Sequence, residues 1–252
     1  MPKKKFILDP KKRFSSRVEN YIKYRPTYPS EIVKYLKEID ILKDDSVIAD
    51  IGSGTGILSE TFLKNGNIVY GVEPNVDMRK AAENLLEIYS NFISIDGSAE
   101  NTKLKVKSIN IITAGQAYHW FDIKQAKKEF KRILKENGYA VLIWNNRKKS
   151  DGDFSDEYEK FILKYGKNYK ITRKDETNIN NFFKYEKKVF FNYQDFDFEG
   201  LKGRLLSASY IPLEDNPEYE DMIKELENIF DKYQKDGIIR LEYDTEVYYG
   251  NL

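Results

Sequence analysis

The clearest chemical signal in this sequence is a set of three alternating glycines that follows an acidic residue. Gly52, Gly54 and Gly56 follow directly on the apolar stretch 47–51, which contains Asp50. Glycine tolerates positive φ angles and has no Cβ, so such a turn lets a ligand approach the backbone closely. The stretch before it is short and rich in β-branched residues, which predicts a buried parallel strand. With helical spacing after the turn, the segment is typical of a strand, turn and helix that bind a nucleotide.

The spacing of the glycines bears on which nucleotide is bound. A dinucleotide fingerprint has the order G-x-G-x-x-G, and its third glycine would fall at Ile57. Here the third glycine comes one residue earlier, in the order G-x-G-x-G. This pattern behind Asp50 resembles motif I of the class I S-adenosylmethionine-dependent methyltransferases. In that family the loop holds a methionine moiety, and a carboxylate at this place suits its ammonium group. The resemblance assigns these residues to the cofactor: Asp50, Gly52, Ser53, Gly54, Thr55 and Gly56.

A second acidic residue, Glu73, follows the predicted strand 68–72. In Rossmann-type sites an acid roughly 20 residues beyond the glycine turn binds ribose hydroxyls. A carboxylate can accept from both vicinal hydroxyls at once. Pro74 and Asn75 come next, and Met78 is placed to touch the adenine or the ribose. We therefore expect this segment to bind the nucleoside part of the cofactor.

The segment after the predicted strand 92–95 resembles the third cofactor segment of the same family, which recognises the adenine edge. Many members have an aspartate where Ser98 falls here, and Ser98 could bond the adenine amino group more weakly. Asp96 is the alternative, with the alignment moved by two residues. Ala99 would contribute through its backbone.

The stretch after the predicted strand 109–113 contains Gln116, the single histidine His119, and Trp120. It resembles the A-x-HWFD segment of small-molecule methyltransferases, which places Gln116 beside the cofactor. It lacks the Asn-Pro-Pro-Tyr motif of methyltransferases that act on adenine or glutamine nitrogens. His119 is the catalytic candidate, because an ordinary pKa near 6.5 suits a general base. A lone histidine is more often structural, and with a carboxylate nucleophile it would only orient the substrate. Trp120 forms a pocket wall or a core anchor.

Two further segments are candidates for a lid and for substrate binding. The segment 25–29 resembles the N-terminal lid of methyltransferases of the UbiE and trans-aconitate type. The lid candidates are Tyr21, Tyr24 and Arg25, and the alternative is an ordinary helix packed by its aromatic residues. Near the C-terminus, Arg204 and Tyr210 recur at helical spacing in a segment similar to one in this branch. An arginine there would suit an anionic substrate, and the alternative is a surface arginine above a buried tyrosine.

The order of these elements predicts an α/β fold. We expect a Rossmann-like seven-stranded methyltransferase sheet, mostly parallel with a late antiparallel strand, with helices on both faces and a helical cap. The predicted parts are N-terminal helices with a possible lid (1–45), the cofactor-binding core (46–147), an inserted helical cap (148–184), and C-terminal strands and helices that complete the sheet and substrate pocket (185–252). A solvated tail is expected over 1–13.

Composition narrows the function classes. The chain has 252 residues, with 42 basic and 41 acidic side chains and a net charge of +1. A balanced chain lacks the field that attracts nucleic acid, so no nucleic-acid partner is expected. The absence of cysteine excludes disulfides and thiolate metal sites and fits a cytoplasmic protein. No apolar run could span a membrane. We expect no metal site, and a monomer or weak homodimer.

The resemblance implies S-adenosyl-L-methionine as cofactor and methyl transfer to a small molecule by direct in-line displacement. The acceptor atom could be oxygen, nitrogen or carbon. Three alternatives stay open at this point. They are a non-catalytic module that binds S-adenosylmethionine, a nicotinamide-dependent oxidoreductase on a similar fold, and a methyltransferase that acts on RNA or protein.

Overall fold

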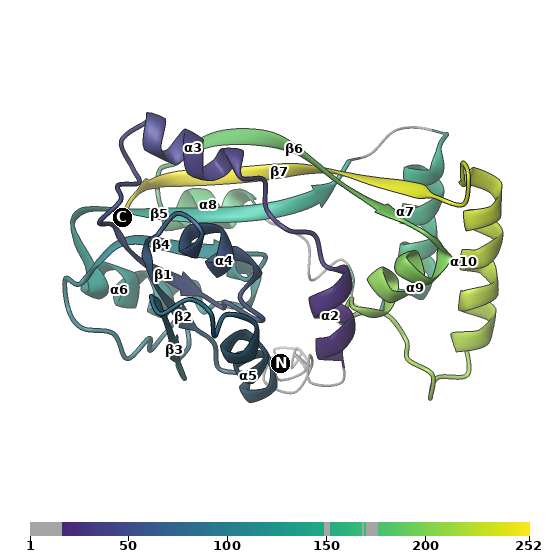
Figure 1. Cartoon of the computed structure of the whole chain (residues 1–252), viewed down its shortest axis with the longest axis horizontal. Coiled ribbons are helices and arrows are strands. Elements are labelled where there is room, and N and C mark those ends of the chain that lie inside the picture. The colour runs from purple at the N-terminus through teal and green to yellow at the C-terminus, as the bar shows by residue number, and fades with distance from the viewer. Residues whose placement is uncertain (1–16, 149–151, 168, 170–175) are drawn as a thin grey trace, which may run out of the picture.

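A computed structural model describes residues 17–148, 152–167, 169 and 176–252, and its strands form one seven-stranded sheet (Figure 1). The strand order is β3-β2-β1-β4-β5-β7-β6. The strands are β1 Val47–Ile51, β2 Ile68–Val72, β3 Phe92–Ile95, β4 Ile109–Gly115, β5 Leu134–Arg147, β6 Glu186–Phe196 and β7 Ile239–Asn251. Strand β7 is antiparallel to both of its neighbours, whereas the other pairs are parallel. The predicted sheet is confirmed.

Helices cover both faces of the sheet. Successive residues of a strand point to opposite faces, and the central strands carry apolar side chains on both. Ile111 and Val141 pack with α3 and α4 on one face, and Ile112 and Ala140 pack with α6 and α8 on the other. The helices are α2 Val18–Tyr24, α3 Glu31–Glu38, α4 Ile57–Leu63, α5 Val76–Leu85, α6 Ile123–Ile133, α7 Phe154–Tyr165, α8 Glu176–Phe182, α9 Phe198–Leu206 and α10 Tyr219–Tyr233. None of the helices in the described part of the chain has the length and apolar character that a bilayer crossing requires.

Helices α7, α9 and α10 form a separate hydrophobic cluster, which we call the cap. They pack against the far ends of β6 and β7, where Leu241 and Tyr243 are buried (Figure 1). Helix α8 instead packs on the sheet through Ile179 and Phe182. The predicted boundary at 184 therefore does not coincide with a boundary between packed clusters. One helix of the cap, α7, belongs to the predicted insert, and the other two, α9 and α10, belong to the predicted C-terminal part.

Helix α2 links the cap to the nucleotide-binding half of the sheet. It contacts both α9 and α5, and Figure 1 shows it between the two parts. Arg17, just before the helix, donates hydrogen bonds to three cap carbonyls, those of Leu206 (2.6 Å), Ala208 (2.8 Å) and Ile211 (2.6 Å). The N-terminal segment is thus anchored on the cap. The predicted tail 1–13 lies outside the described residues.

The Asn137-Gly138 pair is typical of a helix C-cap but does not end a helix in this structure. The helix already ends at Ile133, and β5 begins at Leu134. The positive φ angle falls on Asn137 (61°), not on Gly138. A Cβ on Gly138 would lie 2.8 Å from Leu134 Cδ2 and 3.1 Å from two carbonyl oxygens. Close packing, not helix termination, therefore explains this glycine.

Candidate active site

The glycine turn joins β1 to α4 at the carboxyl end of the central strands. Gly52, Gly54 and Gly56 have φ angles of 69°, 57° and 85°. These angles lie in the left-handed region, which glycine adopts without steric cost and other residues adopt less readily. A Cβ on Gly54 would meet nothing within 4 Å. This part of the loop therefore borders open space that a ligand can enter.

Glu73 at the end of β2 holds the glycine turn in place. Its Oε2 accepts a hydrogen bond from the Gly54 N–H (2.9 Å), and its Oε1 accepts one from the Asn75 N–H (2.8 Å). Burial raises the pKa of the Glu73 carboxyl, while these two N–H groups act to lower it. Each carboxylate oxygen has two lone pairs, so each can accept one further donor. Glu73 thus keeps the capacity to bind two hydroxyls.

A cavity of about 240 Å³, which we call the nucleoside cavity, lies beside Glu73. The residues predicted to bind the cofactor that line it are Gly52, Gly54, Glu73, Pro74, Met78, Ser98, Ala99 and Gln116. They come from four separate segments, which follow β1, β2, β3 and β4. The sheet brings them together because the carboxyl ends of neighbouring parallel strands meet at one edge. Tyr21, Trp120 and Phe121 also contribute walls.

Three residues predicted to bind the cofactor, Gly56, Asn75 and Asp96, line none of the three cavities of the site. Gly56 is the N-cap residue of α4. Asp96 is not among the residues lining the cavity; its side chain is 64% exposed and pairs with Arg79 (3.4 Å) and Lys103 (3.7 Å). Of the two adenine candidates, the structure favours Ser98 by position. The side chain of Asn75 caps α5 instead, because its Oδ1 accepts from the N–H groups at the first helical turn.

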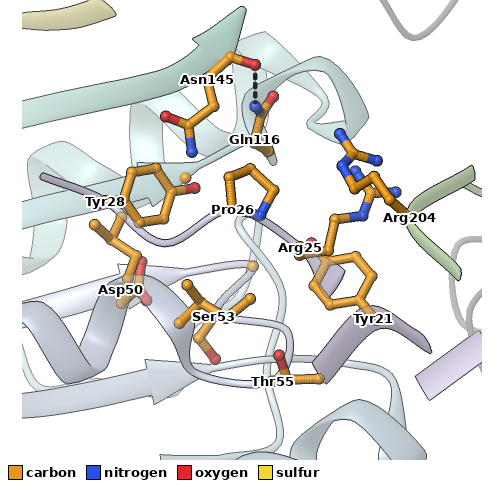
Figure 2. A pocket seen from close by; sticks show the side chains of 14 residues that line it. Tyr21, Arg25, Pro26, Tyr28, Asp50, Ser53, Thr55, Gln116, Asn145 and Arg204 are labelled. Carbon is orange, nitrogen blue, oxygen red and sulfur yellow. Dashed lines mark hydrogen bonds between the residues drawn. The ribbon is translucent and has the colours of Figure 1, made fainter. Parts of the chain in front are cut away.

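A second, narrow cavity of about 30 Å³ also borders the glycine loop (Figure 2). We call it the inner cavity, and it is lined by Asp50, Ser53 and Thr55, three of the residues that the resemblance assigns to the cofactor. The Asp50 carboxyl accepts hydrogen bonds from the hydroxyls of Ser59 (2.7 Å) and Thr113 (3.0 Å). Burial raises its pKa to about 6, although both hydroxyls act to lower it. Asp50 is thus a buried acid with its oxygens already oriented.

The inner cavity also presents polar groups that call for a ligand. Thr55 is buried, and its Oγ1 has no hydrogen-bond partner among the described residues. Such groups are rare in folded proteins and require an explanation. Arg25 lines the same cavity, and Figure 2 shows it on the side opposite Asp50. A cavity with an acid on one side and a base on the other suits a zwitterion such as an amino acid.

Gln116 stands where the cavities meet. It has a positive φ angle of 56°, its N–H donates to the Ile143 carbonyl (2.9 Å), and its Nε2 donates to the Asn145 carbonyl (3.0 Å; Figure 2). Gln116 and Tyr21 line the nucleoside cavity, the inner cavity and a third cavity. Any ligand that spans these spaces therefore passes these two side chains.

The third cavity, of about 630 Å³, lies between the sheet edge and the cap. We call it the large cavity. His119 and Trp120 line it, with ring centroids 4.8 Å apart, and so do the predicted substrate residues Arg204 and Tyr210. His119, the predicted catalytic candidate, thus borders the large cavity. Trp120 lines both this cavity and the nucleoside cavity, which fits a pocket wall.

The lid candidates divide into two groups. Tyr21 lines all three cavities and Arg25 lines two of them. Tyr24 is absent from these linings, because its ring packs on α9 over Gly203, where a Cβ would overlap it. Tyr24 is thus the ordinary packing aromatic of the alternative interpretation. Its contact with α9 holds the helix that presents Tyr21 and Arg25.

Sequence reasoning missed several residues of the site. Tyr28 and Asn145 line the inner cavity, and Arg147, Glu159 and Tyr169 line the large one. Tyr28 belongs to the segment 25–29, which gave a usable signal. Asn145 and Arg147 lie at the carboxyl end of β5, which pairs with β4, so the order of the strands places them near the substrate side. Glu159 and Tyr169 gave no signal, because a long connection separates them from the motifs.

Comparisons with known proteins agree with this geometry. A family described as "Methyltransferase domain" matches residues 49–142. An uncharacterized methyltransferase of Schizosaccharomyces pombe is 31% identical over 141 residues, 54% of each chain. One of Mycobacterium bovis is 31% identical over 134 residues, 53% of this chain and 52% of that one. The chain thus spans about half the length of these curated relatives.

Solved structures share the fold over nearly the whole chain. A putative type II methyltransferase from Anaeromyxobacter dehalogenans has a TM-score of 0.71 at 16% identity, covering 90% of this chain and 98% of the other. A putative methyltransferase from an antibiotic biosynthesis pathway of Anabaena variabilis has a TM-score of 0.61 at 21% identity, covering 91% and 99%. Residues 49–142 therefore resemble a methyltransferase domain, and the chain as a whole shares the fold of these solved structures.

Proposed function

We propose that the protein transfers a methyl group from S-adenosyl-L-methionine to a small molecule. The observation that carries the proposal is the pairing of two cavities around one glycine loop. The nucleoside cavity offers Glu73 to a ribose, and the inner cavity offers Asp50 and Arg25 to an amino acid. S-adenosylmethionine joins a nucleoside to an amino acid, so its two ends match the two cavities.

The residues present fit this cofactor group by group. The free lone pairs of Glu73 can accept both ribose hydroxyls. Asp50 and Arg25 face the ammonium and the carboxylate of the methionine end, and the unpartnered hydroxyl of Thr55 can bond the same end. Bound there, the cofactor would supply an electrophilic methyl group on a positively charged sulfur.

The large cavity would hold the acceptor, since it meets the other two at Gln116 and Tyr21. Positioning and exclusion of water would then supply most of the rate acceleration. An anionic acceptor needs no base. A neutral hydroxyl or amine must lose a proton, and His119 on the cavity wall is placed to receive it.

A nicotinamide-dependent oxidoreductase fits less well. A dinucleotide places a pyrophosphate against the glycine turn. Here the space next to the turn is the narrow inner cavity, and the Asp50 carboxyl borders it. The negative charge of a pyrophosphate would be repelled by that carboxyl.

A module that binds the cofactor without catalysis would make the same contacts with it. The fold and the glycine loop do not separate this alternative from an enzyme, because neither proves turnover.

The test combines ligand stabilisation with product detection. S-adenosylhomocysteine at a hundredfold excess over its Kd should stabilise the chain by about 2.7 kcal/mol, and NAD should not. Labelled S-adenosylmethionine, incubated with fractionated metabolites, should yield a labelled small molecule. The control is Gly54→Val, which closes the loop's open space and strains its backbone. Stabilisation by NAD alone would contradict the cofactor, and S-adenosylhomocysteine binding without any labelled product would favour the non-catalytic module.

A further inference from the structure

Two arginines from different elements meet at the boundary of the inner and large cavities. Arg25 follows α2 and Arg204 lies in α9, and each lines both cavities. Figure 2 shows the two guanidinium groups on the same side of the inner cavity. Arg204 is only 6% exposed. Among the described residues, no aspartate or glutamate lies within ion-pair distance of either side chain.

Their existing hydrogen bonds leave donors free. Arg25 donates from one terminal nitrogen to the Ser207 carbonyl (2.8 Å), and its buried Nε has no partner among the described residues. Arg204 donates from Nε to the Tyr243 hydroxyl (3.3 Å), and its terminal nitrogens have no recorded partner in the described part of the chain. Burial and the charge of Arg204 lower the pKa of Arg25. Two buried like charges are costly unless anions accompany them.

The other charged groups of the large cavity are mostly paired. Arg147 forms an ion pair with Glu159 (2.7 Å), and Lys148 pairs with Glu242 (3.5 Å). Asp244 also lines the cavity. Arg25 and Arg204 therefore remain as the cations without an acidic partner among the described lining residues. Each can bind one carboxylate in a bidentate manner.

The cofactor accounts for one of these two cations. Its methionine end carries a single carboxylate, which the proposed function gives to Arg25. Arg204 is then left for the acceptor. Beside polar side chains, the walls of the large cavity include the aromatic rings of Trp120, Tyr169 and Tyr210, and the last two rings are 4.8 Å apart. Such walls suit a flat apolar body.

We propose that the acceptor is a small carboxylate with a planar apolar body, and that Arg204 binds its carboxylate in the large cavity. This inference rests on the proposed function, because it assumes that the cofactor occupies the other two cavities. It makes Arg204 a determinant of substrate specificity. The helix that carries it also carries the Gly203 contact with Tyr24, so the same helix holds the segment that presents Arg25.

The test is calorimetric titration of the full chain, saturated with S-adenosylhomocysteine, with phenylacetate, phenylacetamide, acetate and phenyl phosphate. Phenylacetate should bind at least about tenfold more tightly than its neutral amide and than acetate, as expected for a charge-assisted hydrogen-bond pair and an apolar body. In Arg204→Gln the preference over the amide should disappear, while the affinity for S-adenosylhomocysteine changes less than about twofold. Arg204→Lys, which keeps the charge, should retain part of the preference.

Three results would overturn the inference. One is equal binding of phenylacetate and phenylacetamide by the unmodified chain, or no binding of either. Another is tighter binding of phenyl phosphate, which would assign the site to phosphate. The third is a loss of S-adenosylhomocysteine affinity in Arg204→Gln with 5′-methylthioadenosine affinity unchanged, which would give Arg204 to the cofactor's carboxylate. Failure of the unmodified chain to bind S-adenosylhomocysteine would instead refute the proposed function.

Discussion

Asp50 shows how one residue can serve both the fold and a ligand. Its carboxyl is fully buried beneath the glycine loop and accepts hydrogen bonds from two hydroxyls, yet it borders the inner cavity. Burial raises its pKa to about 6, so part of the population is protonated near neutral pH. A cation placed beside it would favour the ionised form and lower that pKa.

The pKa of Asp50 predicts a pH dependence of cofactor binding. Because the bound form has the lower pKa, binding releases a proton below pH 6. The affinity for S-adenosylhomocysteine should therefore rise as the pH increases to about 6 and level off above it. Titration calorimetry between pH 5 and pH 7.5 measures this. Asp50→Asn should bind more weakly with a flat profile. A rise that persists in the variant would assign the titration to another group.

Single residues of the site could be predicted from the sequence where they belong to a local motif. The glycine turn could be predicted because its chemistry depends on neighbours a few residues away, and Glu73 because it follows a predicted strand roughly 20 residues beyond that turn. Asp96 and Asn75 could not be separated from true ligands, because the cations around Asp96 and the cap made by Asn75 are visible only in three dimensions. Arg147 pairs with Glu159 across the loop between β5 and α7, and no spacing rule signals that.

At the scale of elements, α6 holds the loop that follows β3 through one buried acid, Glu129. Glu129 is 8% exposed, and its Oε1 accepts from the Thr102 N–H (2.9 Å) and the Thr102 hydroxyl (2.6 Å). Arg132 also donates to it (2.7 Å). The hydrogen bond from Arg132 is the main reason that the pKa of Glu129 falls to about 2, and the Thr102 bonds add to it. The loop that carries Ser98 is thereby tied to α6.

Glu129→Gln should lower the free energy of unfolding at pH 7 by at least about 1.5 kcal/mol, as expected for a lost charge-assisted bond. Since the folded pKa is depressed, this stabilisation is present above the ordinary value of 4.5 and disappears as the pH falls toward 2. Urea unfolding at pH 7 and at pH 3 should show a smaller difference at pH 3. The exposed Glu136→Gln is the control. A difference that does not depend on pH would show that packing, not charge, is responsible.

Strands were predicted better than the ends of helices. The strand β1 is an apolar run with turn residues behind it, and its predicted place agrees with the structure. Asn137-Gly138 looks like a helix cap but does not mark the end of α6, because the chain has already entered β5. At the other end of the helix, Asp122 is a cap that a sequence pattern can indicate, since its side chain acts on the N–H groups of the next two or three residues.

At the scale of the whole molecule, the cavities are lined partly by the cap and by α2, which no local sequence pattern connects to the glycine loop. The cap joins helices from both sides of the predicted boundary at 184, because only tertiary packing shows that α7, α9 and α10 share one cluster. Helix α2 rests on α9 through Tyr24 and reaches the cavities through Tyr21 and Arg25. Both parts of the molecule therefore contribute side chains to the same cavities.

This arrangement predicts that a change in α9 affects cofactor binding at a distance. Gly203→Ala places a methyl group where the Tyr24 ring lies, so α2 must move and carry Arg25 with it. The affinity for S-adenosylhomocysteine should fall at least about fivefold, or roughly 1 kcal/mol. Gly200→Ala is the control, because it adds the same methyl group to the same helix. That methyl group would lie nearest to Phe196 and Asp197, not to the Tyr24 ring. Equal calorimetric affinities for the two variants would show that the contact with α2 is irrelevant to binding.

The central claim is that the loop between β1 and α4, together with Glu73, binds S-adenosylmethionine. Its most direct test is calorimetric titration of S-adenosylhomocysteine into the unmodified chain, Glu73→Gln and Asp96→Asn, with thermal unfolding to verify that each variant is folded. Glu73→Gln should weaken binding at least about tenfold, since it removes a charged acceptor of two hydroxyls. Asp96→Asn should bind as the unmodified chain does, because Asp96 lies outside the cavity. Unchanged binding by a folded Glu73→Gln variant would contradict the claim.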